Sequence, residues 1–140
     1  MRIKPALLSL FICGFVGIAK ADPHNVFGTF LTGEKDSHVT IEPCGEESLC
    51  GKVVWLDPDS LPEGVTPQSA KSKSGDAVLG LTILKGFEKK KKDWRGGTIY
   101  HPGRDKLYAS RLKRLDNGNL QVKGCIAFIC QTQLWIPVVP

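Results

Sequence analysis

The chain has 140 residues, with 19 lysines and arginines against 14 acidic residues, and a formal net charge of +5. This length suits a single domain with one hydrophobic core. Arg2, Lys4 and Lys20 contribute three of the positive charges and no acidic residue precedes Asp22, so the rest of the chain lacks the dense positive charge that is typical of nucleic-acid-binding domains.

The N-terminal segment has the pattern of a secretory signal peptide. Basic residues precede a mostly apolar run over 5–19 and the A-x-A sequence Ala19-Lys20-Ala21, which is typical of a cleavage site. A transmembrane anchor is the alternative, but the apolar run is shorter than the roughly 20 residues that cross a bilayer. We therefore predict a signal peptide over 1–21, a single domain over 22–140 that is periplasmic or secreted, and no transmembrane segment after cleavage.

Alternation of apolar and polar residues recurs after the signal peptide, whereas no sustained period of 3.6 residues is visible. In 37–43, for example, Val39 and Ile41 share one face. Turn sequences such as Asn117-Gly118 separate the alternating runs. The predicted strands are 26–32, 37–43, 50–57, 79–88, 94–100, 106–115, 119–127 and 131–138.

Eight short strands joined mostly by hairpins predict an all-β fold with an antiparallel meander. Closing such a sheet removes its exposed edges, so we expect a small up-and-down barrel of about eight strands, with a two-sheet sandwich as the alternative. An eight-stranded barrel is either filled by side chains or holds one small ligand. The residues expected to point inward are Val39, Ile41, Leu81, Ile83, Leu120 and Val122, and the same face continues to Ile126 and Phe128.

Four cysteines follow the predicted signal peptide, and an even number in an exported domain suggests two disulfides. Each close pair flanks a short turn-like stretch, so we predict the bridges Cys44–Cys50 and Cys125–Cys130; pairing between the two clusters and free thiols are the alternatives. The spacings are wider than C-x-x-C and no histidine lies close by, so we expect no metal or other cofactor.

The segment 58–78 breaks the rhythm of strands because it is rich in proline, serine, glycine and charge. Loops of this length are mobile segments or lids that cover a ligand, and both interpretations stay open. Asp57 lies immediately before this segment, and Asp59 lies at its start. They could act as an acid and base pair or hold calcium, but two acids at a proline-containing strand exit are typical of a turn.

Lysines form a compact basic tip between two predicted strands, at Lys89, Lys90, Lys91 and Lys92. A run of like charges of this kind is usually a solvated turn. The alternative is contact with an anionic surface of the cell envelope, because clustered positive charge attracts phosphate groups.

The stretch "WRGGTIYHPGRDKLY" contains one Arg-Gly-Gly element. Segments that bind RNA through this motif are repetitive, so we interpret Gly96 and Gly97 as a strand bulge or a close backbone approach. His101 lies in the following turn. None of His24, His38 and His101 has a catalytic sequence motif around it, so we assign no catalytic residue, and we lean against an enzyme.

Four stretches carry a family resemblance, namely "CGEESLCGKVVWL", "LGLTILKGF", "WRGGTIYHP" and "LQVKGCIAFICQTQLW". Together they resemble the secreted bacterial domain-of-unknown-function family 2147. The resemblance implies a small lipocalin-like barrel that is exported, without an assigned activity or catalytic residues. The chain departs from the family pattern at Phe30, at His101 and in the 58–78 loop, so no ligand role is carried over to that loop.

These observations favour a non-catalytic binding module for a small apolar ligand near a barrel mouth. The alternatives are an envelope structural or stress-related protein that contacts anionic lipid, glycan or protein, and a hydrolytic enzyme. The residues predicted to bind the ligand are Trp55, Trp94, Tyr100, Tyr108 and Trp135.

Overall fold

The computed structural model describes residues 12–14, 17 and 20–139, so most of the predicted signal peptide lies outside the described residues. The strands are β1 (Gly28–Leu31), β2 (Ser37–Pro43), β3 (Leu49–Leu56), β4 (Thr82–Lys85), β5 (Glu88–Lys89), β6 (Trp94–His101), β7 (Lys106–Arg114), β8 (Leu120–Ile126) and β9 (Ile129–Pro137). A short 3-10 helix, η1 (Pro58–Ser60), follows β3. Within the described ranges, no helix is long and apolar enough to span a membrane.

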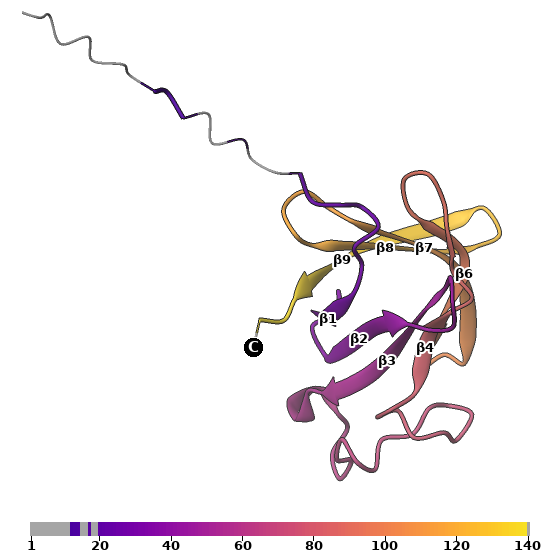
Figure 1. Ribbon diagram of the computed structural model, residues 1–140. Helices are drawn as coiled ribbons and strands as arrows, with labels where there is room; N and C mark the ends of the chain where they lie inside the picture. The colour runs from indigo at the N-terminus through magenta and orange to yellow at the C-terminus, as the bar shows by residue number, and fades with distance from the viewer. Residues whose placement is uncertain (1–11, 15–16, 18–19, 140) are drawn as a thin grey trace, which may run out of the picture.

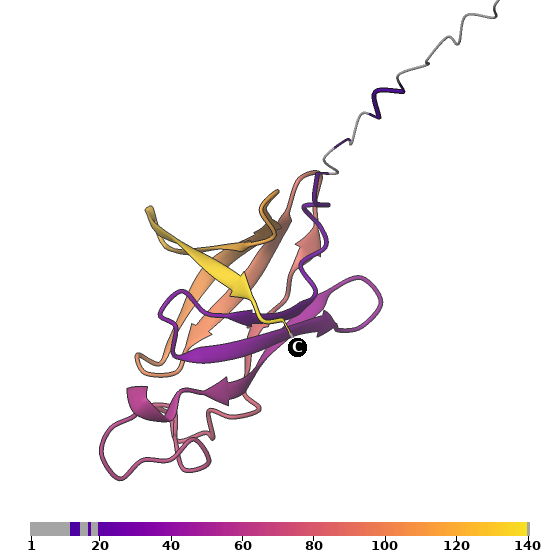
Figure 2. The ribbon, with the colours of Figure 1, turned by 90° about the vertical axis from the view of Figure 1, so that its left-hand side faces the viewer.

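The strands close into an antiparallel up-and-down barrel (Figures 1 and 2). Each strand pairs with the next along the chain, except that β4 pairs with β6 and not with β5. The β4–β6 pairing runs through Leu84 and Ile99, and the two-residue β5 pairs with the first two residues of β6. Pairing of β1 with β9 completes the ring of eight strands. The predicted all-β barrel is therefore confirmed.

Most predicted strands lie within one or two residues of the observed ones, and 37–43 coincides with β2. The predicted strand 79–88 is wrong as a single element. It divides into β4 and β5, because Gly86 between them has a φ of +79°, a left-handed conformation that interrupts a strand. At the other end of the chain, β9 begins two residues before the predicted 131–138, since only Ala127 and Phe128 separate it from β8.

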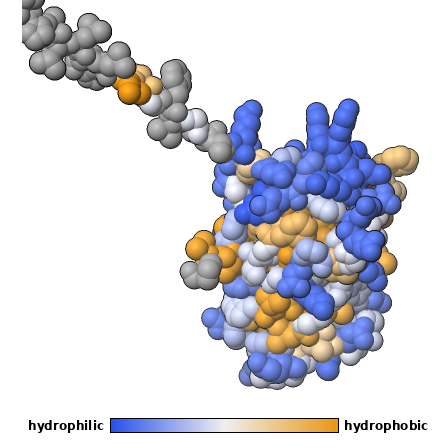
Figure 3. Space-filling model, in the orientation of Figure 1, coloured by the Kyte–Doolittle hydropathy of each residue, from blue (hydrophilic) through white to orange (hydrophobic). Residues whose placement is uncertain are grey.

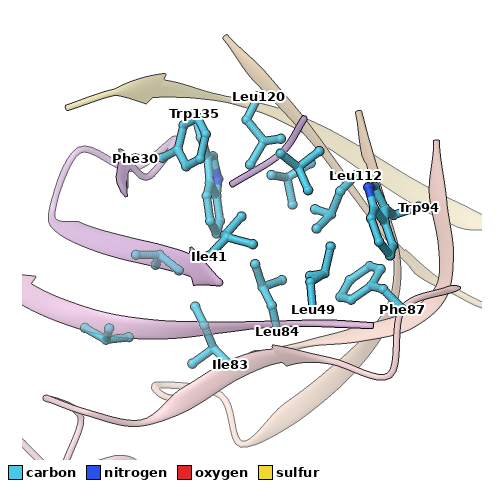
Figure 4. Packing of buried hydrophobic residues seen from close by; sticks show 14 of the residues in the cluster. Phe30, Ile41, Leu49, Ile83, Leu84, Phe87, Trp94, Leu112, Leu120 and Trp135 are labelled. Carbon is cyan, nitrogen blue, oxygen red and sulfur yellow. The ribbon is translucent and has the colours of Figure 1, made fainter. Parts of the chain in front are cut away.

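The barrel encloses one apolar core (Figure 4). Val39, Ile41, Leu120 and Val122 are buried as predicted, as is Ile83, and Leu81 packs partly buried against them. Leu84, which the alternation pattern did not select, is fully buried beside Ile83. The register of β3 and β4 shifts at this point, so β4 carries one extra residue there. A bulge of this kind turns two consecutive side chains to the same side.

The two glycines at the start of β6 serve strand geometry, as predicted. The pairing of β6 with β7 shifts between Trp94 and Gly97, and Gly96 has a φ of +75°. At Gly97 the ring of Phe87 lies so close that a Cβ atom would fall 2.5 Å from it. The glycine therefore makes room for an aromatic ring at the centre of the barrel.

Both predicted disulfides are present, Cys44–Cys50 and Cys125–Cys130. The first closes the loop between β2 and β3, and the second joins paired residues just before the turn between β8 and β9. Each bridge therefore stabilises the end of a hairpin, as the short spacing of each cysteine pair predicted.

The barrel has two ends, which we name by the connections they carry. The base has the β2–β3 and β7–β8 turns and the connection from β4 through β5 to β6. The mouth has the β1–β2, β6–β7 and β8–β9 turns and the long segment 57–81. Residues 22–27 pack against the base: Val26 is fully buried, the Trp94 indole Nε1 donates to the His24 carbonyl oxygen at 2.9 Å, and the Arg114 amide donates to the Pro23 carbonyl at 2.9 Å. These residues close the base.

The segment 57–81 folds beside the mouth and is held by its own hydrogen bonds. Asp57 caps η1 by accepting the amide of Asp59 at 3.0 Å, which confirms the interpretation of these two acids as a turn. Ala70 is buried, and the amide of Lys73 donates to the Pro102 carbonyl at 2.8 Å. The predicted loop is thus irregular but packed, and it is tied to the β6–β7 turn.

Candidate ligand site at the barrel mouth

Large side chains fill the half of the barrel nearer the base. The bulkiest fully buried ones include Trp135, Phe30, Phe87, Leu112 and Leu120. They come from β9, β1, the link between β4 and β5, β7 and β8, and they lie close together in the core (Figure 4). Close packing of this kind leaves no space for a ligand between them. A ligand inside the barrel would therefore have to lie nearer the mouth.

The inner face of β8 and β9 continues beyond this packed layer. Side chains alternate along a strand, so Gly124 and Ile126 share the face of the buried Val122. Ile126 pairs with Ile129, which therefore faces the same way. Ile126 is 45% exposed, Ile129 is largely exposed and Gly124 is partly exposed. Gln131 and Gln133 pair with Gly124 and Val122, so they share this face. At the mouth the inner face therefore combines two isoleucines with glutamine side chains, and it is open to solvent.

Ser110 lies beneath this open face. It pairs with Gly97 on one side and with Gly124 on the other, and its hydroxyl is buried without a hydrogen-bond partner in the part of the chain that the structure describes. A buried unpaired hydroxyl costs about 1–3 kcal/mol. Because this hydroxyl is screened from solvent, a ligand on the open face does not contact it in this structure.

Ile99 and Tyr108 lie over Gly124 and flank the same space. A Cβ atom at Gly124 would fall 3.5 Å from the Cβ of Tyr108 and 3.6 Å from the Cγ2 of Ile99. The resulting surface, which we call the mouth wall, combines apolar contact with hydroxyl groups. Its residues are Ile99, Tyr108, Ser110, Gly124, Ile126 and Ile129.

The two buried tryptophans among the predicted ligand-binding residues belong to the packed core. Trp135 donates from Nε1 to the Gln133 side-chain oxygen at 3.0 Å, and Trp94 contacts Phe27 edge to face with ring centroids 6.1 Å apart. Both are almost completely buried, so their role in this structure is to fill the barrel.

The other three predicted residues lie in three different surroundings. Trp55 stacks on His38 with ring centroids 4.3 Å apart, at the end of β3. Tyr100 donates its hydroxyl to Asp105 at 2.7 Å, in the β6–β7 hairpin. Tyr108 belongs to the mouth wall. Its hydroxyl accepts a hydrogen bond from the Arg104 guanidinium at 3.3 Å, and this contact raises the pKa of Arg104 above its ordinary value. The structure therefore does not gather the five aromatic residues into one site.

Two shallow hollows lie outside the barrel. One, of about 420 Å³, is bounded by Lys90, Lys91, Lys92, Asp93 and Arg95. Figure 3 shows hydrophilic side chains gathered at the top of the view, over this β5–β6 turn. Lys90 pairs with Glu88 at 3.0 Å and Arg95 with Asp93 at 2.6 Å, so acids offset part of the positive charge. The other, of about 430 Å³, lies over the outer face of β2 and β3 beside the Cys44–Cys50 disulfide.

The three histidines lie apart and make local contacts. His24 Nε2 is 2.6 Å from the Lys90 carbonyl at the base, His38 stacks on Trp55, and His101 Nδ1 accepts the amide of Arg104 at 3.2 Å at the mouth. Among the described residues, no group of three His, Cys, Asp or Glu side chains is close enough to hold a metal ion.

A closed eight-stranded antiparallel up-and-down barrel is the architecture of the lipocalin-like class of folds. The chain belongs to the family described as "Uncharacterized protein conserved in bacteria (DUF2147)", whose model matches residues 28–136. A solved structure described as "Protein HP1028 from the human pathogen Helicobacter pylori belongs to the lipocalin family" is similar with a TM-score of 0.63 and 18% identity, covering 86% of this chain and 85% of that one. At this identity the likeness shows the fold alone. No curated protein matches the chain.

Proposed function

We propose that this protein is a non-catalytic binding protein for one small, mainly apolar ligand held at the mouth wall. The observation that carries the proposal is the open inner face of β8 and β9 directly above the packed core, where Ile126 and Ile129 lie beside Gln131. Small-molecule sites are typically apolar concave surfaces with a few polar groups that fix the ligand's orientation. Ile99 and Ile126 supply the apolar surface here, and the Tyr108 hydroxyl and the Gln131 amide supply the polar groups.

The packed base limits what this site can hold. Trp135, Leu120 and Leu112 occupy the depth of the barrel, so a long acyl chain cannot thread through it. The proposed ligand is therefore compact and has one group that hydrogen-bonds the Tyr108 hydroxyl or the Gln131 amide.

A fluorescent apolar probe, N-phenyl-1-naphthylamine, tests the ligand site in solution without lipid. We expect saturable binding to the parent protein and about fivefold to tenfold weaker binding to Ile126→Ser, because the change removes about 1 kcal/mol of apolar contact. Leu134→Ser is the matched control. Leu134 is 50% exposed against 45% for Ile126, but it neighbours the buried Trp135 on the same strand and so faces outward.

Equal weakening in both variants would contradict the proposal, since the inner and outer faces would then behave alike. Absence of saturable binding by the parent protein would contradict it as well.

We also propose that the chain is exported and cleaved after Ala21. The contacts of residues 22–27 with the base support this site, because cleavage there retains every one of those contacts. Intact mass and N-terminal sequencing of the protein recovered from its native cell should give a chain that begins at Asp22. A chain that retains Lys20, or that begins after Val26, would contradict the proposed boundary.

A further inference from the structure

The β8–β9 turn carries an unusual concentration of exposed apolar side chains. Phe128 is fully exposed, Ile129 is largely exposed, and Ile126 beside them is half exposed. The hairpin projects so that its turn stands clear of neighbouring segments (Figures 1 and 2). We call residues 126–129 the apolar tip. Phe128 was predicted on the inward face, and this was wrong, because the chain reverses at Ala127 and Phe128 and carries the ring beyond the barrel.

The apolar tip is held in a fixed shape. The Cys125–Cys130 disulfide bridges the two strands immediately behind it, and only two residues form the turn. A prearranged surface loses little conformational freedom when it binds, so more of its contact energy is available for association. From Gly124 to Leu134 the chain contains no charged residue.

Two cations lie behind the apolar tip, on the outer face of β7 and β8. Arg111 of β7 pairs directly with Lys123 of β8, and neither forms an ion pair with another described residue. Like charges opposite each other on neighbouring strands are destabilising, so an anion between them would be favourable. Lys123 is paired with Thr132, three residues along β9 from Ile129, which corresponds to roughly 10 Å along the strand.

This spacing matches an interface between hydrocarbon and phosphate groups. Apolar groups of surface-bound proteins enter a bilayer by about 5–10 Å, while basic side chains stay at the level of the headgroups. Anionic phosphates would then lie where Arg111 and Lys123 face each other. A protein partner would not by itself require a pair of cations at this distance behind an apolar tip.

We propose that the apolar tip docks onto an anionic lipid bilayer, with Phe128 and Ile129 in the interfacial region and Arg111 and Lys123 on headgroup phosphates. This docking uses the β8–β9 turn and the outer face of β7 and β8, and it shares Ile126 and Ile129 with the mouth wall.

Sedimentation with vesicles tests the docking. The full chain is mixed with vesicles of equal parts phosphatidylglycerol and phosphatidylcholine, or with phosphatidylcholine alone. We expect preferential binding to the anionic vesicles that weakens as salt is raised. The variant Phe128→Ser should bind about tenfold or more weakly, since burial of this fully exposed side chain is lost. Arg111→Gln with Lys123→Gln should lose a similar factor, on the anionic vesicles only.

Three controls make the result specific to the apolar tip. Parent and variants share residues 1–21, so differences between them do not arise from that segment. Val54→Ser removes a half-exposed side chain from β3, and Lys90→Gln with Lys91→Gln removes two charges from the base; both should bind like the parent. Circular dichroism and thermal unfolding should show the same fold for every variant.

Three results would overturn the docking proposal. The parent could bind both vesicle types equally, the lysine variant at the base could lose as much binding as Phe128→Ser, or Phe128→Ser could abolish a lipid-free dimer in sedimentation while vesicle binding stays unchanged. Loss of vesicle binding by Phe128→Ser, which leaves every mouth-wall residue unchanged, together with normal binding of N-phenyl-1-naphthylamine would separate this proposal from the ligand site.

Discussion

Replacing Trp135 with alanine should lower the free energy of unfolding by about 3–5 kcal/mol, the usual cost of removing a buried aromatic side chain. Trp135 is the largest fully buried residue and lies with Phe30 and Leu120 near the closure of β9 on β1 (Figure 4). Urea denaturation followed by far-ultraviolet circular dichroism gives the value, because this signal does not depend on the tryptophan that is removed.

Trp55→Ala is the control for that experiment. Trp55 is largely outside the core and stacks on His38, so its loss should cost much less than that of Trp135. Equal costs for the two tryptophans would contradict a core centred on Trp135.

Replacing Gly97 with alanine should destabilise the barrel by about 1–3 kcal/mol through overpacking. The new methyl group would fall 2.5 Å from the ring of Phe87, which is itself buried. Neighbouring residues that compete for one space are expected to couple. Adding Phe87→Leu to Gly97→Ala should therefore cost less than the sum of the two single changes, as measured by denaturation of all four proteins.

Gly124→Ala provides the contrast for this cycle. Its added methyl group would meet its nearest neighbour, Tyr108, at 3.5 Å, an ordinary contact. We expect Gly124→Ala to change the free energy of unfolding only slightly, and Gly97→Ala to lower it clearly. A strictly additive cycle, or a larger loss at Gly124, would show that the close approach of Phe87 does not decide the effect.

The strands could be predicted because alternation depends on local sequence. Val39, Ile41, Leu120 and Val122 follow a strict period of two and are buried as that period requires. The pattern fails where the backbone departs from regular geometry. Ile83 and Leu84 are both buried because of a bulge, and bulges depend on the pairing between distant strands, which a single sequence does not display.

The aromatic residues predicted to bind a ligand do not lie together in the structure, because aromatic residue type does not indicate exposure. Trp94 and Trp135 were selected for their large rings, and those rings fill the core. The mouth wall instead depends on where the packed layer ends, which is set by Phe87 lying on Gly97 and by the position of Ser110 beside Gly124. Alternation from Val122 already placed Ile126 on the inner face, and extending it across the two-residue turn would have added Ile129.

Amide chemical-shift mapping during titration with N-phenyl-1-naphthylamine tests the central claim most directly. If the ligand binds at the mouth wall, saturable shifts should cluster at Ile99, Tyr108, Ser110, Gly124 and Ile126, while Leu112 and Leu120 in the packed base stay unchanged. Shifts confined to the base or to the outer face of β3, or no saturable shifts, would contradict a ligand site at the barrel mouth.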